Sequence, residues 1–204
     1  SRLSDACDDM ASRKLFVYDS GYVNIHQIRT QMRKLKSSHP EITLCVIDYI
    51  GLMMATSNYS DRHLQIAEIS RGLKLLAREL NMPIIALSQL NRSLESRANK
   101  RPMLSDLRES GAIEQDADMI LFVYRDEVYR EQEEKEAEKK AHAEGKEYVR
   151  KFVPNKIEED AEIIVGKNRN GPVGTVEVIF QKEFTRFVDK SFGAAHVAEF
   201  NPNA

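Results

Sequence analysis

Short, continuous apolar runs alternate along this chain with segments of helical periodicity, and this alternation constrains the fold more than any other feature. The runs are Ile42–Ile47, Ile84–Leu87, Met119–Val123 and Ile163–Val165. Runs of this length that are apolar throughout are typical of strands buried on both faces of a parallel sheet. We therefore expect an α/β fold in which these four runs form adjacent strands.

Two segments between the runs carry apolar residues three and four positions apart, which predicts amphipathic helices. Their apolar positions are Ile25, Ile28, Met32 and Leu35 in the first, and Ile66, Ile69, Leu73, Leu76 and Leu80 in the second. Asn24 and Gln27 have the spacing of a capping box at the start of the first helix. His39 and Pro40 are expected to end it.

The last part of the chain has a different periodicity. Val176, Val178 and Phe180 alternate with polar residues, and Phe184–Val188 follows after a short turn. This pattern predicts an antiparallel hairpin with one wet face. The complete expectation is a mostly parallel sheet flanked by helices and closed by an antiparallel C-terminal hairpin.

Composition excludes several classes of protein. Apolar residues make up 42% of the 204 positions, which argues against a disordered chain. The net charge of −2 neither supports nor excludes a nucleic-acid partner. Two cysteines, Cys7 and Cys45, have neither metal nor disulfide spacing and suit a reducing cytoplasm. No segment has the apolar length of a transmembrane helix, so we expect a cytoplasmic protein without a membrane partner.

Polar residues follow the apolar runs where ligands bind in open α/β sheets, at the carboxyl ends of the strands. Asp48 ends the first run, Ser88 and Gln89 follow the second, and Lys167 and Arg169 end the last. Each of these residues alone could be a simple strand-end cap. A carboxylate, an amide and two cations at three strand ends together favour a site for a nucleoside triphosphate and magnesium.

Four segments carry a more specific pattern. They are Val46–Met53, Ser88–Arg92, Arg101–Asp118 and Lys167–Gly174. In this order they resemble the motifs of DnaB-type replicative DNA helicases, in the C-terminal part of the RecA-like motor domain. The resemblance covers about residues 1–125 and 161–190. It implies a RecA-like sheet and a hexameric, ATP-driven 5′–3′ helicase.

The resemblance also implies a role for each residue at the strand ends. Asp48 matches the Walker B aspartate, which holds Mg²⁺ when ATP is bound. Gln89 matches the residue that senses the γ-phosphate. Arg169 matches the arginine finger and Lys167 its companion, which in this family act on ATP in the neighbouring subunit. ATP and Mg²⁺ are therefore the expected cofactors.

A DNA-binding role is implied for Arg92, Arg108, Glu109 and Gly111. The family's loop at the last three positions tracks the phosphates of single-stranded DNA. Aperiodic sequence from Asn91 to Gly111 contains five cations and no aromatic residue, so we expect a mobile, exposed loop that contacts phosphates without reading bases. Single-stranded DNA, a homo-hexameric ring, a primase and a helicase loader are the implied partners.

Part of the family pattern is missing. The chain contains no GxxxxGK[ST] phosphate-binding loop, and the family's catalytic glutamate is absent too. We expect both upstream of Ser1, so that the motor domain is incomplete on its N-terminal side and this chain alone does not hydrolyse ATP. Residues 1–190 would then be the C-terminal part of the ATPase domain, and residues 191–204 a mobile tail.

A charged segment, about residues 126–160, is longer than the family's usual link. Glu131 with Lys135, and Glu136 with Lys140, have the spacing of helical ion pairs, and Gly145 could end that helix. A solvated surface helix is the simpler interpretation. A docking site for a partner protein is the alternative.

Two other functions compete with the helicase. Another RecA-like ATPase, such as a recombinase or a clock-type ATPase, would share the strand-end residues but not the Arg101–Asp118 segment. A module that has lost catalysis would only bind DNA or partner proteins. A phosphate-binding loop upstream of Ser1 would favour the enzyme.

Overall fold

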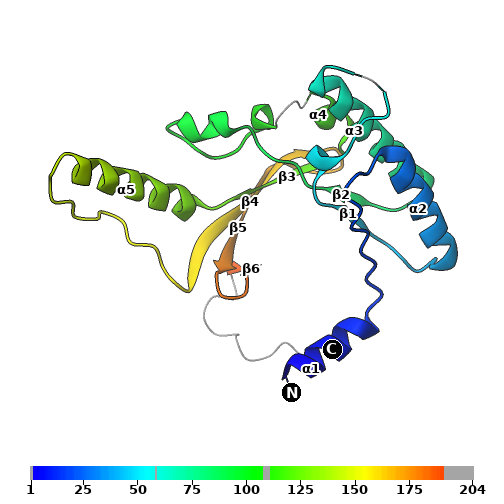
Figure 1. Ribbon diagram of the computed structural model, residues 1–204, viewed down its shortest axis with the longest axis horizontal. Helices are drawn as coiled ribbons and strands as arrows, with labels where there is room; N and C mark the ends of the chain where they lie inside the picture. Colours follow the sequence, from blue (N-terminus) through cyan, green and yellow to red (C-terminus); the bar gives the residue numbers. More distant parts are fainter. Residues whose placement is uncertain (1, 58, 108–110, 191–204) are drawn as a thin grey trace. The chain divides into compact units, whose positions relative to one another are not determined.

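The computed structural model describes residues 2–57, 59–107 and 111–190, which form two compact units (Figure 1). Unit 1 comprises Ser1–Gln89 and Arg108–Ala117. Unit 2 comprises Leu90–Leu107 and Asp118–Ala204. The predicted mobile tail, residues 191–204, lies outside the described residues.

Unit 1 is built on two short parallel strands, β1 (Cys45–Ile47) and β2 (Ile84–Ala86). Cys45 lies opposite Ile84 and Ile47 opposite Ala86. Beyond β2, the Leu87 N–H donates to the Ile47 carbonyl at 2.9 Å, which continues the ladder. The first two apolar runs are thus confirmed as neighbouring strands of a parallel pair.

Four α-helices and a short 3₁₀ turn complete the described part of unit 1. They are α1 (Arg2–Ser12), α2 (Ile25–Ser38), η1 (Ile50–Leu52), α3 (Arg62–Glu79) and α4 (Gly111–Asp116). The capping box at the start of α2 is confirmed: Asn24 and Gln27 exchange side-chain-to-backbone hydrogen bonds of 3.0 Å. The helix ends at His39, as the following proline predicts.

The core of unit 1 lies between α2, α3 and η1. Its buried residues are Ile25, Ile50, Met53, Ile66, Ile69 and Leu73. The predicted apolar stripe of α3 is therefore confirmed as its buried face. Ile113 of α4 packs against the same core, so α4 is fixed to α3 within this unit.

The outer faces of β1 and β2 stay open to solvent. Val46 is 57% and Ile85 is 49% exposed, so burial on both faces, as we expected for these runs, is wrong in the described residues. A short apolar stretch between α1 and α2, Leu15–Tyr18, is exposed and forms no strand. A parallel sheet is buried on both faces only where other elements form a layer over each face. The short strands β1 and β2 lack such a layer over their outer faces in the described residues.

Unit 2 contains an antiparallel sheet in the order β3-β4-β5-β6. Its strands are β3 (Met119–Tyr124), β4 (Glu158–Asn168), β5 (Gly174–Gln181) and β6 (Arg186–Asp189). Hydrophobic residues Ile120, Phe122 and Tyr124 of β3 are buried, and their neighbours on the opposite face are exposed. This sheet has one packed face.

The α/β class and the closing hairpin, formed by β5 and β6, are confirmed. The structure differs in strand direction, because β4 runs antiparallel to β3 and only β1 and β2 run parallel among the described strands. The four apolar runs consequently lie in two sheets. An apolar run carries no information on strand direction, which the path of the connecting segment decides.

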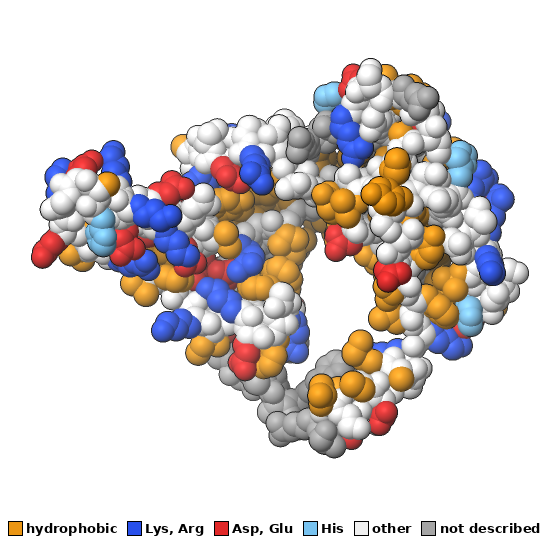
Figure 2. All heavy atoms as spheres, viewed as in Figure 1, with side chains coloured by type: hydrophobic (Ala, Val, Ile, Leu, Met, Phe, Trp, Pro, Cys, Tyr) orange, Lys and Arg blue, Asp and Glu red, His pale blue; other side chains and the backbone are white. Residues whose placement is uncertain are grey.

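That connecting segment is the predicted charged insertion. It begins with α5 (Asp126–Ala143), which extends away from the sheet of unit 2 and mixes acidic and basic side chains on its surface (Figures 1 and 2). Glu131 and Lys135 form the expected ion pair at 2.6 Å, and Gly145 follows the helix with a φ of 68°. No helix in the described ranges is long and apolar enough to cross a membrane.

Candidate functional site

Asp48 and Gln89 lie at the same edge of the sheet in unit 1. Ile47 pairs with Ala86 at the carboxyl ends of two parallel strands, so the residues that follow emerge side by side. The Ile50 N–H donates to the Leu87 carbonyl at 3.0 Å and ties the two strand ends together. The structure therefore brings this predicted carboxylate and amide to one strand edge.

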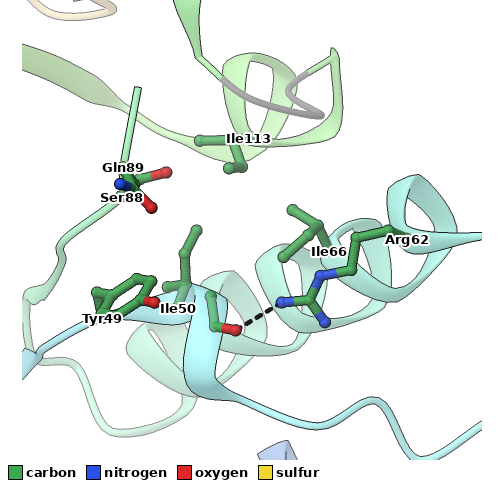
Figure 3. A pocket seen from close by; sticks show the side chains of 8 residues that line it. Tyr49, Ile50, Arg62, Ile66, Ser88, Gln89 and Ile113 are labelled. Atoms are coloured by element: carbon green, nitrogen blue, oxygen red, sulfur yellow. Dashed lines mark hydrogen bonds between the residues drawn. The ribbon is translucent and has the colours of Figure 1, made fainter. Parts of the chain in front are cut away.

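A pocket of about 430 Å³ opens beside these strand ends (Figure 3). Its lining residues come from the turn after β1, the end of β2, and helices α3 and α4: Tyr49, Ile50, Gly51, Arg62, Ile66, Ser88, Gln89 and Ile113. Ile50, Ile66 and Ile113 supply its apolar wall from three different elements, and Gln89, Ser88 and Arg62 supply polar groups. Such a mixture of apolar wall and few polar groups is typical of ligand sites.

The Asp48 side chain is exposed and has no hydrogen bond or ion pair with any described residue. Its carboxylate is thus available to a ligand. Mg²⁺ is commonly held by one or two carboxylates, water and substrate phosphates. The described residues contain no group of three or more His, Cys, Asp or Glu that could hold a metal ion.

Lys167 and Arg169 lie in unit 2, at the end of β4. Lys167 pairs with Ile120 of β3, and the Arg169 N–H donates to the Asp118 carbonyl at 2.9 Å. The Arg169 guanidinium is 3.8 Å from the Asp118 carboxylate, and the two side chains are 47% and 58% exposed. An exposed pair of this kind contributes at most about 1 kcal/mol.

The four strand-end residues therefore form two pairs. Asp48 and Gln89 belong to the parallel sheet, and Lys167 and Arg169 belong to the antiparallel one. We predicted one sheet edge for all four. The structure satisfies this expectation within each pair, and the two pairs belong to different sheets.

The residues predicted to bind DNA fall in different settings. Arg92 opens the 3₁₀ turn η2 (Arg92–Ser96), is exposed, and has no side-chain partner among the described residues. Gly111 is the exposed first residue of α4. Arg108 and Glu109 lie outside the described residues.

The expectation of an open, exposed loop from Asn91 to Gly111 is only partly met in its described residues. Leu94, Asp106 and Leu107 are buried. The Arg97 guanidinium donates to the Asp106 carboxylate at 2.7 Å, and the short 3₁₀ turn η3 (Leu104–Asp106) ends on that aspartate. A buried carboxylate requires a counter-charge, which Arg97 supplies to Asp106. The amino-acid composition of the segment could not show which of its cations has this role.

Two more cations of this segment also bind acids of unit 2. Arg101 donates to Glu162 of β4 at 2.8 Å, and Lys100 pairs with Glu133 of α5. Their partners are far away in the sequence, so spacing gave no signal. Arg92 is consequently the described cation of the segment that is best placed for an external phosphate.

Arg62 is the pocket residue that the sequence did not single out. Its Nη2 donates to the Gly51 carbonyl at 2.7 Å (Figure 3). The only local signal was Asp61, a helix-capping type that accepts from the His63 N–H at 2.8 Å and marks the start of α3. Only the packed structure places this arginine beside the residues that follow Asp48.

Comparison with known proteins gives a consistent picture. The family described as DnaB-like helicase C terminal domain matches residues 1–189. "Replicative DNA helicase DnaB" of Helicobacter pylori (strain ATCC 700392 / 26695) is 51% identical over 199 residues, covering 92% of this chain and 41% of that protein. The DnaB protein of Rickettsia felis is 43% identical, covering 92% of this chain and 37% of its own length.

Solved structures agree with the sequence matches. "The Structure Of A DnaB-Like Replicative Helicase And Its Interactions With Primase" superposes with a TM-score of 0.76 at 38% identity, covering 92% of this chain and 40% of that chain. "ATPase Domain of G40P" has the same TM-score of 0.76 and the same 38% identity, and the match covers 92% of this chain and 59% of that chain. The chain thus spans about two fifths of the length of its similar curated relatives.

Proposed function

The chain belongs to the family of DnaB-like helicase C-terminal domains, and on that premise we propose that residues 1–190 form the C-terminal part of the motor domain of a replicative DNA helicase. The whole protein would couple ATP hydrolysis to movement along single-stranded DNA and to unwinding of the duplex. Its site of action would be the cytoplasm.

The observation that carries this proposal is the parallel register of β1 and β2. It sets Asp48 and Gln89 at one strand edge, beside a pocket, in a chain of this family. Asp48 would hold Mg²⁺ together with the phosphates of ATP, and the metal would neutralise charge that develops on the phosphoryl group. Gln89 would hydrogen-bond the terminal phosphate and report whether it is present.

Lys167 and Arg169 would complete the site in the neighbouring subunit of a homo-hexameric ring. Arg169 supports this role because its side chain is half exposed at the end of β4. Charge spreads over the transferring phosphoryl group in the transition state, and an arginine there stabilises it. A composite site of this kind requires assembly of the ring.

Single-stranded DNA would bind along Arg92, Arg108, Glu109 and Gly111. The exposure of Arg92 and of Gly111 supports the proposal for those two positions. The DnaB-like replicative helicase of one matched structure interacts with primase, and we propose a primase and a helicase loader as partners of the present protein.

The proposal is tested on the full-length protein with ATPase and strand-displacement assays. We expect hydrolysis that single-stranded DNA stimulates, and we expect Asp48→Asn to abolish it while the ring still forms. An unmutated protein that binds DNA without hydrolysing ATP would instead identify a module that has lost catalysis.

A further inference from the structure

The turn after Asp48 is short and tightly closed. The Leu52 N–H donates to the Tyr49 carbonyl at 3.0 Å, and the Met53 N–H donates to the Ile50 carbonyl at 3.1 Å. A Cβ on Gly51 would come within 2.4 Å of the Tyr49 ring, so the turn accepts glycine there and no larger residue without rearrangement. The turn therefore has little freedom of its own.

Arg62 fastens this turn to α3. Its Nη2 donates to the Gly51 carbonyl at 2.7 Å, and its Nη1 donates to Gln65 Oε1 at 2.9 Å. Gln65 in turn donates to the Tyr59 carbonyl at 2.7 Å. The guanidinium is partly buried, where a charge-assisted hydrogen bond to a backbone carbonyl holds geometry well.

The same helix also holds α4. Ile66, one turn beyond Arg62, lines the pocket together with Ile113 of α4. Further along, Arg71 of α3 lies 3.6 Å from the Asp116 carboxylate of α4. The start of α4 is Gly111, at the end of the segment proposed to contact DNA. Helix α3 thus contacts both the turn after Asp48 and the helix that follows the DNA-binding segment.

From this geometry we infer that Arg62 is a positioning residue that links the candidate nucleotide site to α4 and, through α4, to bound DNA. The inference rests on the function proposed above. Arg62 acts on the site through the turn after Asp48, which its hydrogen bond to the Gly51 carbonyl keeps in a fixed relation to α3. A movement of α4 on DNA binding then reaches Asp48 through α3 and the Arg62–Gly51 hydrogen bond.

The test uses Arg62→Ala, Arg62→Lys and Arg78→Ala in the full-length protein. Arg78 is an exposed arginine of the same helix, so its variant controls for loss of a charge on α3. We expect Arg62→Ala to lower kcat for DNA-stimulated ATP hydrolysis about tenfold to a hundredfold, as displaced catalytic groups do. KM for ATP and the affinity for oligothymidylate should stay close to those of the unmutated protein.

Arg62→Lys should recover most of the missing turnover, because its ammonium can still donate to the Gly51 carbonyl. Equal kcat in Arg62→Ala and Arg78→Ala overturns the inference. A lysine variant as slow as the alanine variant overturns it too, since the hydrogen bond would then not be the cause.

Amide hydrogen exchange tests the link without any activity. The Leu52 and Met53 amides should exchange faster in Arg62→Ala than in Arg78→Ala, and unchanged exchange overturns the inference whatever the ATPase result. If the unmutated protein hydrolyses no ATP, the proposed function fails, and the exchange experiment still decides whether Arg62 fixes the turn.

Discussion

The two sheets of this chain differ in how their strands are paired and covered. In unit 2, four strands pair with their sequence neighbours, and 11 residues of β4 support both β3 and β5. In unit 1, two strands of three residues form a parallel pair whose outer edges and outer faces are open among the described residues. Antiparallel neighbours close their ladders locally, whereas a parallel pair depends on crossovers and on further layers.

The same division separates the candidate functional residues. Unit 1 carries Asp48 and Gln89 beside a pocket, and unit 2 carries Lys167 and Arg169 at a strand end. In the proposed site, the side formed by Asp48 and Gln89 and the side formed by Lys167 and Arg169 would therefore rest on structurally different supports. The following changes test this separation, from the largest expected effect to the smallest.

Arg169→Ala in the full-length protein should leave ATP binding largely intact and lower kcat by about 10³ to 10⁵, the range known for arginine fingers. Mixing this variant with Asp48→Ala should restore part of the activity. In mixed rings, a site with an intact Asp48 can receive an intact Arg169 from its neighbour. Steady-state ATPase of the mixture measures this, and a mixture no faster than its components would place both residues in one subunit's site.

Phe122→Ala in β3 should destabilise unit 2 by about 3 to 5 kcal/mol, because the ring is only 3% exposed. Val46→Ala in β1 should change the free energy of unfolding of this chain by less than about 1 kcal/mol, because 57% of Val46 is exposed. Urea unfolding of both variants compares the two sheets. Equal destabilisation would mean that β1 is as well packed as β3.

Arg97→Ala should destabilise the segment from Leu90 to Leu107 by about 2 kcal/mol, the cost of leaving a buried polar group without its partner. The substitution leaves the buried Asp106 carboxylate without the guanidinium that lies 2.7 Å away. Limited proteolysis should then cut between residues 97 and 106. Asp106→Asn combined with Arg97→Ala should recover stability relative to Arg97→Ala alone, because the amide buries no charge.

In contrast to Arg97→Ala, Arg92→Ala should weaken DNA binding and leave stability almost unchanged. Stability should stay within about 0.5 kcal/mol, as for other exposed side chains. The affinity of the full-length protein for single-stranded DNA should fall equally for mixed sequences, and the salt slope should decrease by about 0.7 for each DNA phosphate that the protein no longer neutralises. Arg108→Ala should give the same result, and an unchanged slope in both variants would remove these arginines from the DNA path.

The smallest expected effect concerns Glu68 of α3. Its carboxylate accepts hydrogen bonds from Thr56 and so fixes a loop of unit 1. The Asp106 carboxylate has the same role in unit 2 through Arg97. Hydrogen bonds from the Thr56 hydroxyl and backbone N–H lower the Glu68 pKa from 4.5 to about 2. Because the folded pKa is depressed, the stabilisation is present above pH 4.5 and is lost as the pH falls toward 2. The difference in melting temperature between the unmutated chain and Glu68→Gln should shrink over that range, whereas a constant difference would exclude ionisation as the cause.

The sequence by itself determined the local elements and the positions where chemistry could occur. Periodicity located α2 and α3, because a helix that packs on a core must repeat its apolar residues every three or four positions. Asn24 and Gln27 fixed the start of α2 through their own side chains. Asp48 and Gln89 were found because strand-end residues of parallel neighbours share an edge, and their motif context supplied the family.

Only the tertiary structure decided strand direction, the partners of the basic residues and the place of Arg62. The run Ile163–Val165 is equally apolar in either direction, and the path of α5 and the segment after it turned β4 antiparallel to β3. Arg97 and Arg101 look like DNA contacts in the sequence, yet each binds a specific carboxylate of unit 2. Ion pairs and pocket contacts join residues that are distant in the chain, and their geometry arises only after the core has packed.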